Sequence, residues 1–203
     1  MKQEPRRALI SVYDKTNLEL LLPCLTEFKY DIIASGKTAS KIKELGYEAK
    51  EVADISGFPE SPGGLLKTLH PRIHGGFLLD PRDDEQERYM RSHNIVPITM
   101  LVSNLYPFRE VATRKGVTLL EAANNIDIGG PTLVRSAAKA ALLRGNVAVL
   151  TNPSQYEIVV ENLKKNKGQL DSQVTLRLAS EAFKLTYTYD DAIQQYLSRL
   201  RGA

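Results

Sequence analysis

The sequence has one cysteine, Cys24, and no tryptophan among its 203 residues. A single cysteine excludes an intrachain disulfide and is typical of a reducing compartment, so we expect a packed core thiol in a cytoplasmic protein. Long hydrophobic runs are also absent, because nothing approaches the roughly 20 apolar residues of a membrane-spanning helix. The polar start, Met1–Arg7, is not followed by an apolar signal core. We therefore expect no membrane partner.

A strong charge of either sign is missing too. The chain carries 27 Lys and Arg against 24 Asp and Glu, a formal net charge of +3. This small excess argues against a nucleic-acid partner but suits a small anionic ligand. Hydrophobic residues at 42% and charged residues at 25% are ordinary for a globular protein. The length predicts a single domain, residues 1–203, with a core at about 8–151 and a helical C-terminal extension at about 154–203.

Short apolar runs bounded by turn residues predict buried strands. Helical segments separate the first three, which is typical of a parallel sheet with helices on both faces. The sequence therefore predicts an α/β fold of three layers, a mostly parallel sheet flanked by helices. The predicted strands are Ala8–Val12, Asp31–Ala34, Tyr47–Val52, Ile98–Val102 and Asn146–Thr151.

Helix signals lie between and after these strands. Thr118 and Glu121 have the spacing of a capping box, and Pro131 suits the first position of an Ala-rich helix that runs to about Arg144. The last helix is predicted to be long and amphipathic, with an apolar stripe of Leu176, Ala179, Phe183 and Tyr187 at helical spacing. Other helices are expected at Asn17–Phe28, with a kink at Pro23, at Ala39–Leu45 and at Asp83–Ser92.

A segment rich in hydrogen-bond donors lies between two glycine pairs, at residues 63–76. Lysine, threonine and arginine are side chains that hold oxyanions, so the segment is a candidate binding loop; a plain surface connection is the alternative. Pro71 predicts that no regular helix runs through it. His70 and His74 could suggest a metal pair, but a catalytic zinc needs three protein ligands, and we expect no metal. The donors are Lys67, Thr68, His70, Arg72 and His74.

Polar clusters also follow the predicted strands. In an open parallel sheet, ligands bind beyond the carboxyl ends of the strands, and helix amides that begin there favour an anion. Asp127 precedes the bare amides of Ile128 and Gly129, with Lys139 farther along the same helix; alternatively, Asp127 only caps that helix. No G-x-x-x-x-G-K-[ST] or G-x-G-x-x-G motif is present. The clusters are Ser11 and Lys15, then Ser35, Gly36 and Thr38, then Asn104 and Tyr106.

Four motifs together resemble the IMP cyclohydrolase domain of bifunctional purine-biosynthesis proteins. They are Lys67-Thr68-Leu69-His70-Pro71 with His74-Gly75-Gly76, Asn104-Leu105-Tyr106-Pro107-Phe108, Ile126-Asp127-Ile128-Gly129-Gly130, and Ala137-Ala138-Lys139. The resemblance runs from about Ala8 to Thr151. It implies a methylglyoxal-synthase-like fold, a homodimer, and the ring closure of 5-formamidoimidazole-4-carboxamide ribotide to IMP without a metal or organic cofactor.

The resemblance also implies roles for individual residues. The catalytic set would be Lys67, Tyr106, Asp127 and Lys139, with the lysines stabilising the oxyanion and Tyr106 and Asp127 relaying protons or orienting the amide. The nucleotide substrate would be bound by Ser11, Lys15, Ser35, Gly36, Lys37, Thr38, Thr68, Asn104, Ile128 and Gly129.

Four residues depart from the family's pattern. Tyr13 replaces a serine, Lys37 a glycine, Leu65 an arginine and Ala140 an asparagine. Lys37 adds a charge beside the phosphate-binding cluster, and we expect it to contact phosphate. Two other functions stay open: a non-catalytic methylglyoxal-synthase-like module that binds a phosphorylated metabolite and regulates a partner, and methylglyoxal synthase itself.

Overall fold

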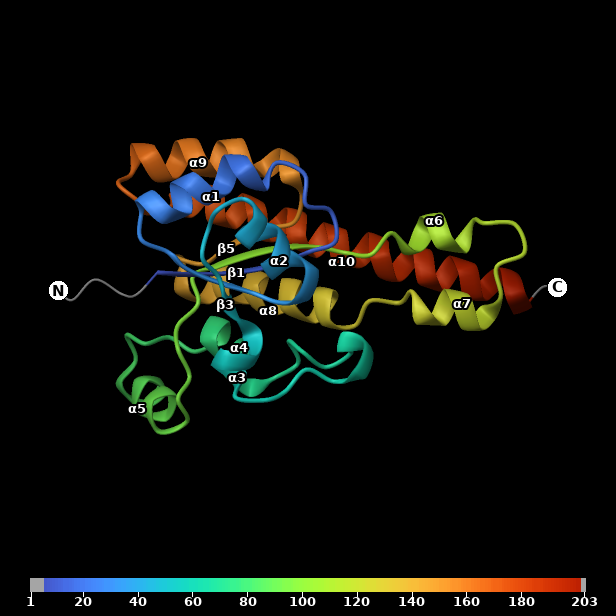
Figure 1. Ribbon diagram of the computed structural model, residues 1–203, viewed down its shortest axis with the longest axis horizontal. Coiled ribbons are helices and arrows are strands. Elements are labelled where there is room, and N and C mark those ends of the chain that lie inside the picture. The colour runs from blue at the N-terminus through green and yellow to red at the C-terminus, as the bar shows by residue number, and fades with distance from the viewer. Residues whose placement is uncertain (1–5, 202–203) are drawn as a thin grey trace.

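The computed structural model describes residues 6–201, so most of the predicted polar start lies outside the described residues. Its centre is a five-stranded sheet in which every pairing is parallel (Figure 1). The strands are β1 (Arg7–Val12), β2 (Asp31–Ala34), β3 (Lys50–Glu51), β4 (Met100–Asn104) and β5 (Ala148–Leu150), in the spatial order β3-β2-β1-β4-β5. The predicted α/β fold is confirmed.

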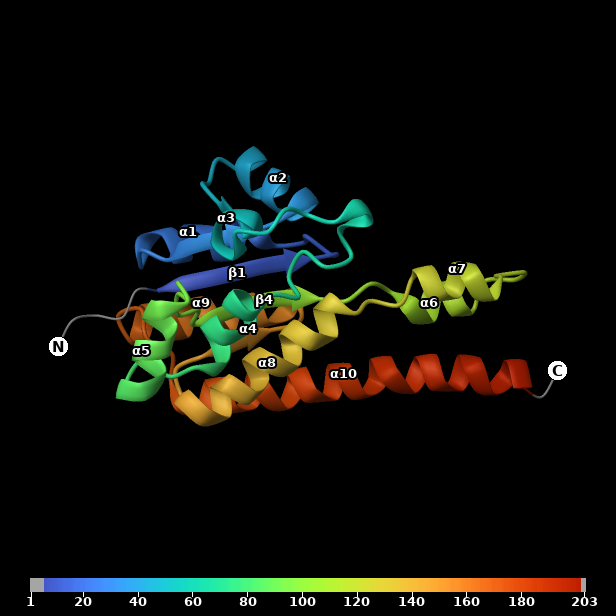
Figure 2. The ribbon, with the colours of Figure 1, turned by 90° about the horizontal axis from the view of Figure 1, so that it is seen from below.

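Helices cover both faces of this sheet. α8 packs on β4 and β5 and against α4 and α10, and Figure 2 shows α1 and α2 on the opposite side of the sheet. The helices are α1 (Leu18–Glu27), α2 (Gly36–Glu44), α3 (Val52–Ser56), α4 (Pro71–Leu78), α5 (Asp84–Ser92), α6 (Phe108–Ala112), α7 (Leu119–Asn124), α8 (Gly129–Arg144), α9 (Tyr156–Lys165) and α10 (Ser172–Arg201), with short 3-10 turns at Pro62–Gly64 and Pro153–Gln155.

The central strands are buried on both faces. Leu9 and Ile10 of β1, Leu101 of β4 and Val149 of β5 have no exposed surface. This explains why the strands could be predicted from apolar runs, since a parallel strand that lies between two layers of helices has no polar face. Cys24 is a buried free thiol, as expected.

α6, α7 and the second half of α10 project from the sheet as an arm (Figure 2). The arm has its own small core, in which the Phe108 ring meets Tyr189 and Tyr196 edge-on at centroid distances of 6.2 and 5.9 Å. Ala122 of α7 and Ala192 of α10 complete this core. α10 therefore serves two cores, one against the sheet and one in the arm.

The predicted stripe on the last helix is wrong at two positions, because Leu176 and Tyr187 are 50% and 70% exposed. The predicted residues are spaced 3, 4 and 4 apart, whereas the helix packs along a seam of residues spaced 3, 4, 3, 4 and 3 apart, which keeps one face on its neighbours from residue 179 to residue 196. The residues on this seam are Ala179, Ala182, Thr186, Tyr189, Ile193 and Tyr196.

The prediction that Pro71 excludes a helix is also wrong. Pro71 is the first residue of α4, where a missing amide costs no hydrogen bond, and His70 is its N-cap, with Nδ1 accepting from the Arg72 amide at 3.2 Å. The prediction that Pro131 is the first residue of its helix is also wrong, because α8 already begins at Gly129. The third strand is shorter than predicted, since α3 begins at Val52.

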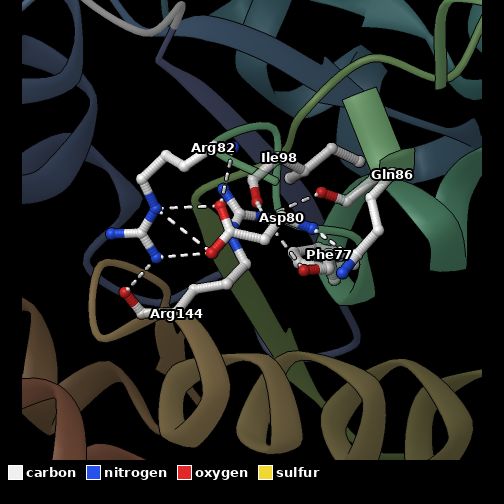
Figure 3. A network of polar contacts seen from close by, with 7 residues as sticks. Phe77, Asp80, Arg82, Gln86, Ile98 and Arg144 are labelled. Atoms are coloured by element: carbon white, nitrogen blue, oxygen red, sulfur yellow. Dashed lines mark hydrogen bonds and ion pairs between the residues drawn. The ribbon is translucent and has the colours of Figure 1, made fainter. Parts of the chain in front are cut away.

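Arg144 joins α8 to the end of α4 (Figure 3). It is only 4% exposed, and its Nη1 donates to the carbonyls of Gly76 at 3.1 Å and Phe77 at 2.9 Å. These carbonyls lie in the last turn of α4, where a helix has no partners of its own. Arg82 donates to the Arg144 carbonyl at 2.9 Å and to Asp80 at 2.7 Å, and this guanidinium lowers the pKa of Asp80.

Replacing Arg144 should therefore destabilise the fold. Arg144→Met takes the guanidinium donor away from the buried Phe77 carbonyl and leaves the Gly76 carbonyl with the Ile98 amide as its donor, and we expect the free energy of unfolding to fall by about 2–4 kcal/mol. The measurement is chemical denaturation followed by circular dichroism. The control is Arg88→Met, on the exposed surface of α5, which should change stability by less than about 0.5 kcal/mol. Equal midpoints for the two variants would contradict the role given to Arg144.

Candidate active site

The polar clusters meet at the carboxyl edge of the sheet. Val12 at the end of β1 is paired with Asn104 at the end of β4. Thr38, in α2 after β2, bonds to the Val12 backbone through its hydroxyl, accepting from the amide at 3.3 Å and donating to the carbonyl at 3.1 Å. Segments from three strands are thus tied together at one edge. Thr38 is only 4% exposed, so its first role is to fix this junction.

Asn104 ties β4 to the loop after β1. Its Oδ1 accepts from the amides of Tyr13 and Asp14, both at 2.8 Å, and its Nδ2 donates to the Asp14 carbonyl at 2.9 Å. The side chain therefore holds the loop with three hydrogen bonds. Sequence reasoning treated Asn104 as a substrate ligand, and the structure adds this architectural role.

Three lysines converge beside this loop. Lys15 Nζ donates to the carbonyls of Val12 and Tyr13, both at 3.1 Å. Burial lowers the pKa of Lys15 most; the positive charges of Lys37 and Lys67 lower it further, and the Asp14 carboxylate opposes this. Like charges gather in this way where an anion is to be bound. Among the described acidic side chains, Glu60 forms an ion pair with Lys67 at 3.9 Å.

The start of α2 adds an unused hydroxyl. Ser35 is the N-cap of α2, is 6% exposed and makes no side-chain capping bond. Within residues 6–201, its buried Oγ has no hydrogen-bond partner. Gly36 follows with φ of +52°, and a Cβ there would lie 3.8 Å from Lys67 Nζ. A buried hydroxyl at a helix N-terminus beside a lysine is suited to an anionic ligand.

Asp127 lies at the start of α8. Its Oδ1 accepts from the Gly130 amide at 2.8 Å, so Asp127 satisfies an amide of the first helical turn, which is the capping role considered for it above. Burial raises the pKa of Asp127 and is the largest effect; the amides of Gly130 and Tyr106 and the charge of Lys67 oppose it. A carboxyl group with a raised pKa beside a lysine can exchange protons closer to neutral pH than an ordinary aspartate.

Two glycines allow the close approach of side chains to α8. A Cβ on Gly130 would lie 2.5 Å from Asp127 Oδ2, and one on Gly129 would lie 2.9 Å from Thr68 Oγ1. Thr68 is 4% exposed. Glycine at both positions therefore lets Asp127 and Thr68 sit directly against the positive end of the helix.

His74 supports this region from α4. Its Nδ1 lies 2.8 Å from the hydroxyl of Ser136 in α8. Burial lowers the pKa of His74, and the Thr68 carbonyl opposes this, so the imidazole is neutral near pH 7. No group of three or more potential metal ligands among His, Cys, Asp and Glu occurs within residues 6–201.

Tyr189 is a contact that sequence reasoning missed. Its hydroxyl, on α10, accepts from the Asp127 amide at 2.7 Å and donates to the Asn125 carbonyl at 3.4 Å. Burial raises the pKa of Tyr189 to about 12, so the hydroxyl stays protonated. The 3, 4, 3 seam of α10 was the available signal, because it predicts that Tyr189 faces inward.

Lys139 does not join the cluster within one copy of the chain. It is exposed, ten residues beyond Gly129 on α8, and therefore about 15 Å along the helix axis. Ile128, by contrast, lies at the start of α8 and is 58% exposed. Ser11 lies in β1 opposite Ser103 of β4. The residues that do gather around the edge are Lys15, Ser35, Gly36, Lys37, Thr38, Lys67, Thr68, Asn104, Tyr106, Asp127 and Gly129.

Comparisons with known proteins agree with this architecture. The sequence profile of the MGS-like domain matches residues 20–132, and that of the AICARFT/IMPCHase bienzyme matches residues 137–202. The bifunctional purine biosynthesis protein PurH of Xanthomonas euvesicatoria pv. vesicatoria is 46% identical over 95% of this chain, and that of Trichodesmium erythraeum is 45% identical over 95%. The chain spans 36% and 37% of the lengths of these two relatives.

A solved structure supports the same assignment. The crystal structure of ForH matches with a TM-score of 0.82 at 27% identity, over 96% of this chain and 100% of the ForH chain. The MGS-like match covers more than half of the chain and includes the strands β2, β3 and β4 and the start of α8. This chain belongs to the MGS-like domain family.

Proposed function

We propose that this chain is an IMP cyclohydrolase. In this reaction the carboxamide nitrogen of 5-formamidoimidazole-4-carboxamide ribotide attacks the formyl carbon, a C–N bond forms, and the formyl oxygen leaves as water. The match to the AICARFT/IMPCHase bienzyme profile and the 46% identity to a PurH protein support this activity. Both the nucleotide substrate and the product IMP carry a phosphate, which suits the three lysines at the site.

The observation that carries the proposal is the meeting of Lys67, Tyr106 and Asp127 at the start of α8. The Tyr106 amide and the Lys67 charge both act on the Asp127 carboxyl group. Asp127 can accept the proton that the carboxamide nitrogen loses, and Lys67 can stabilise the oxyanion that forms at the formyl group. The amides of Ile128 and Gly129 can polarise the carboxamide oxygen.

The phosphate would lie at the start of α2. Ser35 offers a hydroxyl and Gly36 an amide there, Thr38 holds the junction beside them, and Lys15 and Lys37 offer positive charge. The substrate would then reach from α2 to α8 across the carboxyl edge of the sheet, with Ser11, Thr68 and Asn104 between. Because ring closure is intramolecular, holding the two reacting groups together supplies much of the rate.

The oligomeric state and the cellular compartment are also proposals. We propose a homodimer in the cytoplasm, on the resemblance and on the single cysteine. Among the helices of residues 6–201, none combines the length and hydropathy that crossing a bilayer requires.

Purified chain should convert the formylated ribotide to IMP, seen as rising IMP absorbance. Lys67→Ala should lower turnover by about 100-fold or more, the scale of one lost oxyanion contact. The matched control is Lys164→Ala, on exposed α9, which should keep the wild-type rate. Lys139→Ala belongs in the same assay: a similar loss supports the catalytic role implied by the resemblance, and a wild-type rate removes it. IMP binding without turnover would favour the regulatory module, and methylglyoxal formation would favour the synthase.

The pH dependence should report Asp127. Its pKa is raised by burial, so the carboxylate is lost as pH falls through a value above the ordinary 3.9 or so. We expect kcat/KM to fall on the acid side at that raised value. Asp127→Asn should lower the rate and remove this acid limb. Glu161→Gln, an exposed carboxyl on α9, should leave the profile unchanged. An acid limb that survives in Asp127→Asn would assign the proton transfer to another group.

Lys37 should strengthen phosphate binding. Its side chain is exposed in the first turn of α2, and its charge already acts on Lys15. We expect Lys37→Ala to weaken IMP about 3- to 10-fold, with a smaller effect at high salt, and to leave inosine unchanged. Lys41→Ala, one turn farther along α2, is the matched control. The affinities for both ligands are measured by calorimetry. Equal losses of affinity for IMP and inosine would exclude a contact between Lys37 and the phosphate.

A further inference from the structure

An aromatic pair stands at the site, and the proposed chemistry uses only one of its members. The ring of Tyr13, in the loop after β1, lies against the ring of Tyr106, after β4. The ring centroids are 5.1 Å apart, and the planes are tilted by 55°. The two side chains are 53% and 50% exposed, so each presents one side to its partner and the other to solvent. Such tilted pairs attract each other beyond the area that they bury.

The backbone of Tyr13 is held on both sides. Its amide donates to Asn104 Oδ1 at 2.8 Å, and its carbonyl accepts from Lys15 Nζ at 3.1 Å. Asn104 belongs to β4, only two residues before Tyr106. The Tyr13 ring therefore stands on a fixed support that is anchored to the same strand end as Tyr106.

The backbone of Tyr106 is equally restrained. Its amide lies near the Asp127 carboxyl group and lowers the pKa of that group, and its carbonyl accepts from the Phe108 amide at 2.8 Å. A half-exposed tyrosine on a fixed backbone can still change its χ1 rotamer. The contact with Tyr13 limits this remaining freedom, since leaving the observed rotamer breaks the ring pair.

We infer that Tyr13 is a positioning residue: its ring holds Tyr106 in the orientation that serves ring closure beside Asp127. This inference rests on the proposed function. Tyr13 acts through Tyr106 and takes no part in proton transfer. Its effect should therefore appear in turnover and leave substrate affinity almost unchanged.

Kinetics of Tyr13→Ala and Tyr13→Phe test the inference. We expect Tyr13→Ala to lower kcat about 2- to 10-fold, the range set by one aromatic pair, with KM changed less than about 2-fold. Tyr13→Phe keeps the ring and should restore the wild-type kcat. The matched control is Tyr89→Ala, which should leave kcat unchanged. Tyr89, in α5, is 51% exposed and stacks on His93, the residue after α5. Thermal midpoints of all variants check folding.

Three outcomes would overturn the inference. An unchanged kcat in Tyr13→Ala means that the ring pair has no role in turnover. A higher KM with an unchanged kcat means that Tyr13 contacts the substrate directly. A loss in Tyr13→Phe equal to that in Tyr13→Ala means that the hydroxyl matters and the ring does not.

A spectroscopic test keeps this inference separate from the proposed function. The chain has no tryptophan, so Tyr13→Trp introduces a single indole. Its emission should shift when Tyr106→Ala is added, without any substrate, and should not shift when Tyr89→Ala is added instead. No shift with Tyr106→Ala would contradict the contact itself. Absence of IMP formation by the wild type would overturn the proposed function and leave this result standing.

Discussion

The site depends on one steric constraint: there is no space for a Cβ atom at Gly129 or Gly130. A Cβ at either position would meet Thr68 or Asp127 at less than 3 Å. Thr68, from a distant part of the chain, and Asp127, just before the helix, can therefore touch the first turn of α8 at its positive end. The Tyr106 amide lowers the pKa of the same carboxyl group, so the segment after β4 and the start of α8 lie close together where the chemistry is proposed.

Electrostatics at this edge differ from those of the chain as a whole. The net charge is only +3, yet Lys37 and Lys67 lie close enough to Lys15 to lower its pKa, an effect that the Asp14 carboxylate opposes. The Lys15 ammonium bonds to loop carbonyls and Lys67 pairs with Glu60, so part of this charge is balanced within the protein. The gathering of three lysines arises from the convergence of strand ends, and composition alone does not reveal it.

The strands and the edge where they end could be predicted from the sequence, because buried parallel strands are continuous apolar runs. The division of the chain at about residue 151 stays a prediction. Contacts such as those of Arg144 could not be predicted, because a guanidinium that binds the carbonyls of Gly76 and Phe77 has no sequence signature. The start of α4 was missed because one proline can end a helix or begin it. Lys139 shows the limit of a motif, which gives order along the chain but not proximity.

The hydrogen bond of the Tyr189 hydroxyl can form only late in the synthesis of the chain. It holds the Asp127 amide across 62 residues of sequence. As the chain leaves the ribosome, β1 to β5 are available to pair before α10 exists, whereas the Asp127 segment gains this restraint only after residue 189 has emerged. A nascent chain can therefore hold a finished sheet while the Asp127 backbone beside it still lacks this hydrogen bond, whose closure over 62 residues costs more chain entropy than a contact within one helix.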